Sequence, residues 1–264
     1  MLEVKSIHKT FHLDSNPEND KYALRGVSLT IEEGDFVTVI GSNGSGKTTL
    51  LNMIAGVYPP DEGQIILDGK DISRLPIHKR AKAIGRVFQD PMVGTIADMS
   101  LFENLSIASR RGKPQSPVKW ALSKSSENHF KELLAPLNLG LENRLNSPMG
   151  TFSGGQRQSV TLLMATMAKP QILLLDEHTA ALDPSTAKKV MELTDEIVTK
   201  TKTPTLMITH NMKDAIKYGN RLIMMDGGKI VFEASGEEKK ALTVKTLLEK
   251  FSALGELPDS AILA

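Results

Sequence analysis

The segment from Gly41 to Thr48 constrains this chain more than any other feature. It reads Gly-Ser-Asn-Gly-Ser-Gly-Lys-Thr and fits the pattern G-x-x-x-x-G-K-[ST] at every required position. The apolar run Phe36 to Ile40 before it predicts a buried strand, and Thr49 to Ile54 after it predict the first turns of a helix. In this order, backbone N–H groups and a helix N-terminus converge on one anion. The sequence therefore predicts a phosphate-binding loop.

Two side chains of the loop have predicted roles in binding a nucleotide. Lys47 is expected to reach the outer phosphates, and Thr48 is expected to offer its hydroxyl to magnesium. The alternative is a chance glycine loop, which the lysine, the threonine and both flanking elements disfavour. The predicted nucleotide-binding residues of this segment are Gly41, Ser42, Asn43, Gly44, Ser45, Gly46, Lys47, Thr48 and Thr49.

Composition excludes several classes of protein. The 264 residues suffice for one large domain or two small ones, and the net charge of +1 argues against a dedicated nucleic-acid binder. The absence of cysteine excludes disulfides, thiolate zinc sites and cysteine nucleophiles. No signal peptide is evident, and the apolar runs are of strand length. We therefore expect a cytoplasmic protein that has no membrane span of its own.

The opening third is predicted to be a β-rich layer around the phosphate-binding loop. Residues 2–7 and 27–31 alternate in the manner of strands, and 64–67 predict a strand that enters a hairpin turn. Leu2, Val4 and Ser6 are predicted to face away from Glu3, Lys5 and Ile7.

Helical spacing appears in the middle of the chain, and strands alternate with helices later. Helices are predicted over 98–109 and 125–137. The basic stretch 110–124 between them is expected to be a mobile surface loop, or alternatively a contact with a partner or with anionic lipid headgroups. The later alternation predicts a parallel sheet covered on both faces. Strands are expected at 172–175, 205–209, 222–225 and 230–233, helices at 184–199, 212–218 and 242–251, and a loose tail after them.

An apolar strand that ends in two carboxylates adds to the predicted site. It runs from Ile172 to Leu175 and is followed by Asp176 and Glu177. Asp176 is expected to hold magnesium through water, and Glu177 is expected to polarise a water for attack on the γ-phosphate. Apolar strands ending in acids are common, so this feature alone does not identify a function.

A second glycine turn narrows the function. Phe152 precedes the sequence Ser153-Gly154-Gly155-Gln156, which opens a helix and carries no lysine. Such a turn is expected to complete a phosphate site rather than to form one. Here the chain resembles the ATP-binding-cassette (ABC) ATPases, whose signature is Leu-Ser-Gly-Gly-Gln. The resemblance covers roughly Val4 to Glu233.

The resemblance implies roles for further residues. Gln89 matches the family's Q-loop glutamine, which contacts magnesium and the reacting groups, and His210 matches the switch histidine. Asp183 matches the D-loop and is implied in nucleotide binding. Phe11 stands where such proteins stack an aromatic ring on adenine, with Tyr22 as a rival. Taken singly, Phe11 could be a core aromatic, Gln89 a surface amide and His210 a structural histidine.

Two residues depart from the family pattern. Phe152 replaces the leucine of the signature, and His178 stands where many members have proline. Phenylalanine is also an apolar anchor, so phosphate contact should persist. A histidine beside Glu177 could shift the pKa of that carboxyl. A hydrogen-bonded surface imidazole is the interpretation that we favour for His178.

The resemblance implies an α/β fold: a P-loop NTPase with a RecA-like core, an antiparallel β subdomain and an inserted helical subdomain at about 90–168. These parts would form one domain over 1–240, with a short C-terminal helix and tail at 241–264. It also implies a head-to-tail homodimer with two ATP molecules and Mg²⁺. Each phosphate-binding loop would face the Ser153–Gln156 turn of the other copy.

The function that the resemblance implies is transport. A separate membrane permease would contact the segment from Gln89 to Met99, whose methionines supply an adaptable apolar surface. The sequences at 86–91 and 177–181 resemble bacterial importer ATPases, which implies a substrate-binding lipoprotein, a place on the inner face of the cell membrane, and import of a small solute such as an amino acid.

Two other functions compete with transport. The alternative is a soluble ABC ATPase that assembles protein complexes, of the iron–sulfur type. A small-molecule P-loop kinase is disfavoured because the second glycine turn and His210 would have no purpose in it.

Overall fold

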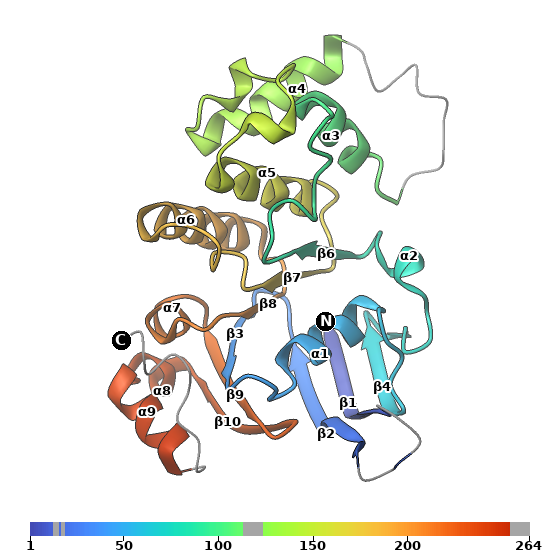
Figure 1. Cartoon of the computed structure of the whole chain (residues 1–264), viewed down its shortest axis with the longest axis vertical. Helices are drawn as coiled ribbons and strands as arrows, with labels where there is room; N and C mark the ends of the chain where they lie inside the picture. Colours follow the sequence, from blue (N-terminus) through green and yellow to red (C-terminus); the bar gives the residue numbers. More distant parts are fainter. Residues whose placement is uncertain (13–15, 17–18, 113–123, 254–264) are drawn as a thin grey trace.

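The computed structural model describes residues 1–12, 16, 19–112 and 124–253. It contains two β-sheets, with helices packed around them and a group of helices at one end (Figure 1). Most of the basic stretch 110–124, part of the segment 14–21 and the expected loose tail fall outside the described residues. Of the described helices, none is both long enough and apolar enough to cross a membrane.

The larger sheet has six strands in the order β10-β9-β3-β8-β7-β6. Five of them are parallel, and β10 pairs with β9 antiparallel at one edge. Central strands β3, β7 and β8 are almost wholly buried because helices cover both faces, as the sequence predicts. The bounds are β3 Phe36–Gly41, β6 Ile84–Val87, β7 Ile172–Asp176, β8 Thr205–Ile208, β9 Arg221–Asp226 and β10 Lys229–Ser235.

The smaller sheet is antiparallel, in the order β2-β1-β4-β5. The predicted alternation of its first strand is wrong beyond Lys5. Ser6 has a φ of 47° and lies at an irregularity in the pairing, so the pleat reverses there. Ile7 is consequently buried and Ser6 is exposed. The strands are β1 Leu2–Phe11, β2 Lys21–Ile31, β4 Glu62–Leu67 and β5 Lys70–Asp71.

Helices α3, α4 and α5 have an apolar core of their own, built around Leu105, Phe130 and Val160. Helix α3 begins at Leu101, three residues later than predicted, because Ser100 and Glu103 form a capping box there. Helix α4 ends at Leu134, and Pro136 lies in the 3₁₀ turn that follows. Their bounds are α3 Leu101–Ser109, α4 Lys124–Leu134 and α5 Gly154–Thr166.

The remaining helices cover the sheets or stand near the C-terminal end of the described chain. The short helix α8 was not predicted, because its charged residues show no apolar periodicity. It is anchored by the buried Lys239, whose ammonium donates to the carbonyls of Tyr218 and Gly219. The bounds are α1 Lys47–Ala55, α2 Ile77–Arg80, α6 Pro184–Thr201, α7 Met212–Lys217, α8 Gly236–Lys240 and α9 Val244–Ala253.

Candidate active site

The predicted functional residues gather where the parallel strands end. Val39 of β3 pairs with Ile208 of β8, and Ile208 pairs with Asp176 of β7. The phosphate-binding loop, the two carboxylates and His210 therefore follow neighbouring strands at one edge of the sheet. This edge is the usual ligand site of open α/β sheets.

The phosphate-binding loop joins β3 to α1 and is closed around its own lysine. The Lys47 ammonium lies 2.7 Å from the Gly41 carbonyl oxygen and 2.8 Å from that of Ser42. Gly46 has a φ of 100°, and a Cβ there would lie 2.5 Å from the carbonyl oxygen of Ala23. Only glycine fits this position. Helix α1 begins directly after Gly46 with no side-chain cap, so its first N–H groups are available to an anion.

A cavity of 180 Å³ opens over this loop. Thr48 is exposed there, and Glu177 reaches it from the end of β7. Of the predicted loop residues, Gly41, Ser42 and Ser45 form the loop itself but do not line the cavity. Its lining is Phe11, Lys21, Ala23, Asn43, Gly44, Gly46, Lys47, Thr48, Thr49 and Glu177.

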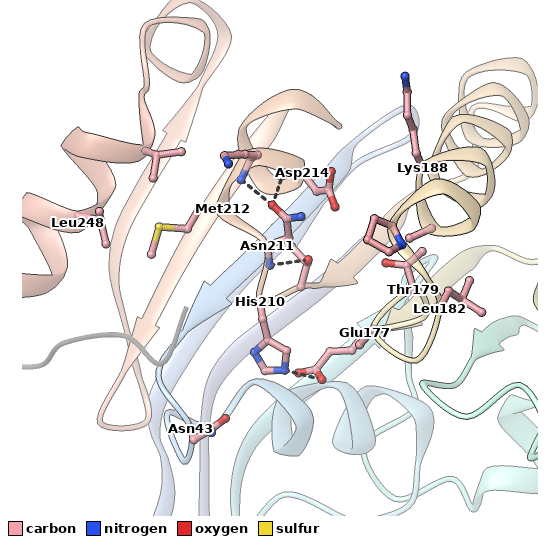
Figure 2. Close-up of a pocket in the computed structure, with 16 residues that line it drawn as sticks. Asn43, Glu177, Thr179, Leu182, Lys188, His210, Asn211, Met212, Asp214 and Leu248 are labelled. Carbon is pink, nitrogen blue, oxygen red and sulfur yellow. Dashed lines mark hydrogen bonds and ion pairs between the residues drawn. The ribbon is translucent and has the colours of Figure 1, made fainter. Parts of the chain in front are cut away.

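Glu177 and His210 form a close pair. The Oε2 atom of Glu177 lies 2.5 Å from Nε2 of His210. Figure 2 shows the two side chains pointing toward each other. Glu177 is mostly buried, whereas His210 is about half exposed. The Glu177 backbone has a φ of 48°, an uncommon conformation for a residue with a side chain. The fold thus holds this carboxylate and the imidazole together, in a geometry suited to positioning a water.

Asp176 is paired with Arg86, for which the sequence predicts no role of its own. Nη2 of Arg86, on β6, lies 3.1 Å from its Oδ2. Burial raises the pKa of the Asp176 carboxyl, and the Arg86 charge opposes this effect. In the described part of the chain, Asp176 is thus paired with Arg86, and Glu177 is paired with His210. The pairing of Arg86 follows from the order of the strands, which the sequence does not reveal.

The residues present fit a magnesium ion. Mg²⁺ prefers oxygen ligands and usually binds through one or two protein groups, substrate phosphates and waters. Thr48 lines the cavity, and Asp176 ends the strand from which Glu177 enters that cavity. A bound ion would neutralise charge on the phosphates. Gln89, the other predicted ligand, is exposed and lines neither of the two cavities that we describe.

A larger cavity of 660 Å³ adjoins the first one, and Asn43 and Glu177 line both. Figure 2 shows His210 and Glu177 close together, with Met212 and Leu248 to their upper left. Thr179 and Leu182 supply its wall toward α6, and Met212 and Leu248 supply the opposite, apolar wall.

The second glycine turn lies apart from the phosphate-binding loop. None of the residues Ser153 to Gln156 lines either cavity. The Ser153 hydroxyl accepts from the Gln156 N–H, and the Ser153 N–H donates to the Gln156 side chain, which together form a capping box on α5. Gly155 lies so close to Thr186 of α6 that a Cβ would clash. The neighbouring Gly154 begins α5.

Asp183 is the N-cap of α6 and accepts from the Ser185 hydroxyl and the Thr186 N–H. Hydrogen bonds from Thr186 and Ser185 lower the pKa of its carboxyl to about 2. Its neighbours Leu182 and Pro184 line the larger cavity, whereas Asp183 does not.

The structure distinguishes the two candidates for adenine stacking. Phe11 lines the cavity over the phosphate-binding loop, and its ring packs edge-on against Tyr58 at 5.3 Å between centroids. Tyr22 is 56% exposed, does not line that cavity and stacks with Arg25. Only Phe11 therefore lies where a nucleotide base could reach it from the loop. Tyr58 is a neighbour that sequence reasoning missed.

The interpretation of His178 as a surface residue is wrong. Its side chain is buried, and Nε2 lies 3.0 Å from the Thr194 hydroxyl on α6. Burial lowers the pKa of His178 to about 4, so the imidazole is neutral at physiological pH. We assign it a structural role between the end of β7 and α6.

Comparisons with known proteins agree with this geometry. The family model for ABC transporters matches residues 24–180. The chain belongs to the ABC transporter family. It is 46% identical to a tyrosine transport ATP-binding protein of Clostridioides difficile, over 95% of this chain and 98% of that protein. It is 34% identical to the L-cystine import ATP-binding protein TcyN of Bacillus subtilis, over 95% and 92%.

Solved ABC cassettes share the fold. A dimeric cassette in a post-hydrolysis state bound to ADP and Pi has a TM-score of 0.74 at 28% identity, over 89% of this chain and 98% of that one. A cassette in its ADP conformation has a TM-score of 0.76 at 30% identity, over 97% and 99%. The predicted family, P-loop NTPase fold and ATPase activity are confirmed. The iron–sulfur assembly alternative is not favoured, since the relatives are transport and import proteins.

Proposed function

We propose that this ABC ATPase drives the import of a small solute, with an amino acid as the first candidate. The observation that carries the catalytic part is the Glu177–His210 pair beside the phosphate-binding cavity. Glu177 would accept a proton from the attacking water, and His210 would hold the carboxylate in place. Lys47 and the loop amides would bind the phosphates, while Thr48, Asp176 and Gln89 would hold Mg²⁺ directly or through water.

We further propose that the working form is a head-to-tail homodimer around two ATP molecules. One copy offers a phosphate-binding loop at the sheet edge, whereas its Ser153–Gln156 turn lines neither cavity. Ser153 is exposed, and the turn stands at a helix N-terminus, which is suited to phosphate, so a second copy would complete each site. The dimeric solved cassette supports this arrangement. Asp183 would lie at the same interface.

The domain division remains a proposal of ours as well. A cassette over 1–240 with an inserted helical part at about 90–168 suits the separate apolar core of α3, α4 and α5. Residues 241–264 would be a C-terminal extension of the cassette. Its helix α9 packs on α7 and β9 through Leu247 and Phe251.

A permease would dock on an apolar surface that follows β6. Four large apolar side chains are exposed between residues 92 and 99, and a cluster of this kind marks an interaction site more often than scattered residues do. A coupling helix of a membrane protein would cover them, which would hold the ATPase on the inner face of the membrane. A substrate-binding lipoprotein would act through that permease. The docking residues are Met92, Val93, Ile96 and Met99.

Charged residues on this surface are expected to abolish docking. Met92→Asp combined with Met99→Asp would bury unpaired carboxylates beneath the partner helix, which is costly. We expect at least tenfold less permease in a pull-down, with nucleotide binding unchanged, because neither residue lines the nucleotide cavity. Val231→Asp, an exposed residue of β10, is the control. Undiminished permease association would place docking elsewhere.

Co-purification with the permease also tests the proposed transport function. The chain should co-purify with the membrane protein encoded beside it, and vesicles containing both should accumulate an amino acid only when ATP is supplied. Association with a soluble assembly complex, and none with a membrane protein, would overturn the transport proposal.

Phe11 rather than Tyr22 is expected to bind adenine. Phe11→Ala should weaken ATP binding about 5- to 160-fold, since stacking of a base on an aromatic ring is worth about 1–3 kcal/mol. Tyr22→Ala should leave the affinity within about twofold. Calorimetric titration with ATP and with tripolyphosphate separates loss of the base contact from damage to the phosphate site. An equal loss for both ligands in Phe11→Ala would contradict the assignment.

A further inference from the structure

The ion pair between Arg86 and Asp176 engages a carboxylate that we propose as a magnesium ligand. Strand β6 lies beside β7, and Arg86 is in register with Leu174, two residues before Asp176. The two side chains are 14% and 13% exposed, so solvent screens this pair only weakly. The guanidinium also stacks on the ring of Phe88, with its central carbon 4.5 Å from the ring centroid. Arg86 is therefore held in place from two sides.

The pair is not an optimal Arg–carboxylate contact. A guanidinium can bind a carboxylate with two parallel N–H groups, but here a single bond of 3.1 Å joins Nη2 to the carboxylate. The Nε atom of Arg86 is buried and has no hydrogen-bond partner among the described residues. Such an unsatisfied group needs a reason, since buried polar atoms are normally paired. The incomplete bonding of Arg86 would be explained if its contact with Asp176 has to break during each catalytic cycle.

The chemistry of Asp176 indicates what would displace Arg86. A carboxylate bound to one cation binds a second cation less readily, and a divalent ion beside phosphates would be the strongest local charge of the site. We propose that Arg86 is the counter-ion of Asp176 in the metal-free site and that it raises the Mg²⁺ concentration needed to assemble the ATP-bound site. This inference rests on the proposed Mg²⁺-dependent ATPase. The side chain would swing off Asp176 when Mg²⁺ binds and stay stacked on Phe88.

Arg86, which Mg²⁺ would displace from Asp176, lies close in sequence to the proposed docking surface. Arg86, Phe88 and Gln89 are on one segment that leads from β6 to Met92. The proposed movement of Arg86 would therefore take place on the segment that leads to the proposed docking surface.

The test is the Mg²⁺ dependence of nucleotide binding. Calorimetric titration of the full chain with a non-hydrolysable ATP analogue, over a range of free Mg²⁺ and in EDTA, gives the Mg²⁺ midpoint and the metal-free affinity. Arg86→Met keeps an unbranched, flexible side chain, although a shorter one, and removes its charge. We expect its Mg²⁺ midpoint to fall about 5- to 10-fold, as for the loss of one competing charge near a binding site. Arg86→Lys should keep the midpoint within about threefold, because it keeps the charge.

A matched control separates this role from simple stability. Arg221 forms a similarly shielded pair with Asp35, at the opposite end of the parallel strands. Arg221→Met should lower the melting temperature as Arg86→Met does, but should leave the Mg²⁺ midpoint unchanged. Melting curves with and without Mg²⁺ report folding of each variant. If Arg86→Met is too unstable, Arg86→Gln takes its place.

Different outcomes would overturn the counter-ion role of Arg86 and the proposed Mg²⁺ site itself. An unchanged or raised Mg²⁺ midpoint in the neutral Arg86 variants would overturn the counter-ion role and leave Arg86 as a structural residue. Absence of any Mg²⁺ effect on nucleotide binding in the wild-type chain would instead overturn the proposed metal-dependent site itself.

Discussion

Glu177→Gln is expected to bind ATP and to hydrolyse it about 10²- to 10⁴-fold more slowly, the range that a general base contributes. The amide keeps the size of the side chain, and its oxygen can still accept from Nε2 of His210, 2.5 Å away in the wild-type pair. The fold around the φ of 48° at residue 177 should therefore persist. What is lost is the ability to accept the proton of the attacking water.

Phosphate release measures the rate, and gel filtration with ATP and Mg²⁺ measures the oligomeric state. If ATP closes a homodimer and hydrolysis opens it, the variant should elute as a dimer with ATP and as a monomer without it. Glu196→Gln, an exposed residue of α6, is the control and should turn over normally. Rapid turnover, or a variant that stays monomeric with ATP, would contradict the role of Glu177.

The sequence predicts the parts of the site that depend on order along the chain. The loop from Gly41 to Thr48, the acids after β7 and His210 after β8 each follow a recognisable strand, so their convergence at one sheet edge could be expected. The α/β fold followed from the same alternation of strands and helices.

What the sequence does not predict depends on which strands are neighbours and how deeply a residue lies. Arg86 meets Asp176 only because β6 pairs with β7. His178 appears polar, yet α6 covers it and Thr194 binds it. The reversal of the pleat at Ser6 comes from a local irregularity in the pairing of β1. Tertiary contacts decide all three.

Lys47→Ala is expected to have a comparably large effect, but on binding. The Lys47 ammonium is the one cation of the motif, and its side chain is buried in the loop. Losing such a contact in a closed site costs about 3–4 kcal/mol by analogy with lost transition-state donors, which corresponds to about 10²- to 10³-fold. Calorimetric titration with ATP should show this loss, and hydrolysis should fall with it. Near-normal turnover would overturn the assignment of this loop.

The effect of Lys47→Ala on ATP binding must be separated from its effect on the structure of the empty loop. The ammonium also donates to the carbonyls of Gly41 and Ser42, so the substitution removes bonds that close the empty loop. Far-UV circular dichroism and melting curves without nucleotide report that structural part, which we expect to be small because α1 and β3 are held by the apolar core. Lys213→Ala, which lines the adjoining cavity, is the matched control and should keep ATP affinity. A Lys47→Ala protein that melts like the wild type yet fails to bind ATP would assign the loss to the phosphate contact itself.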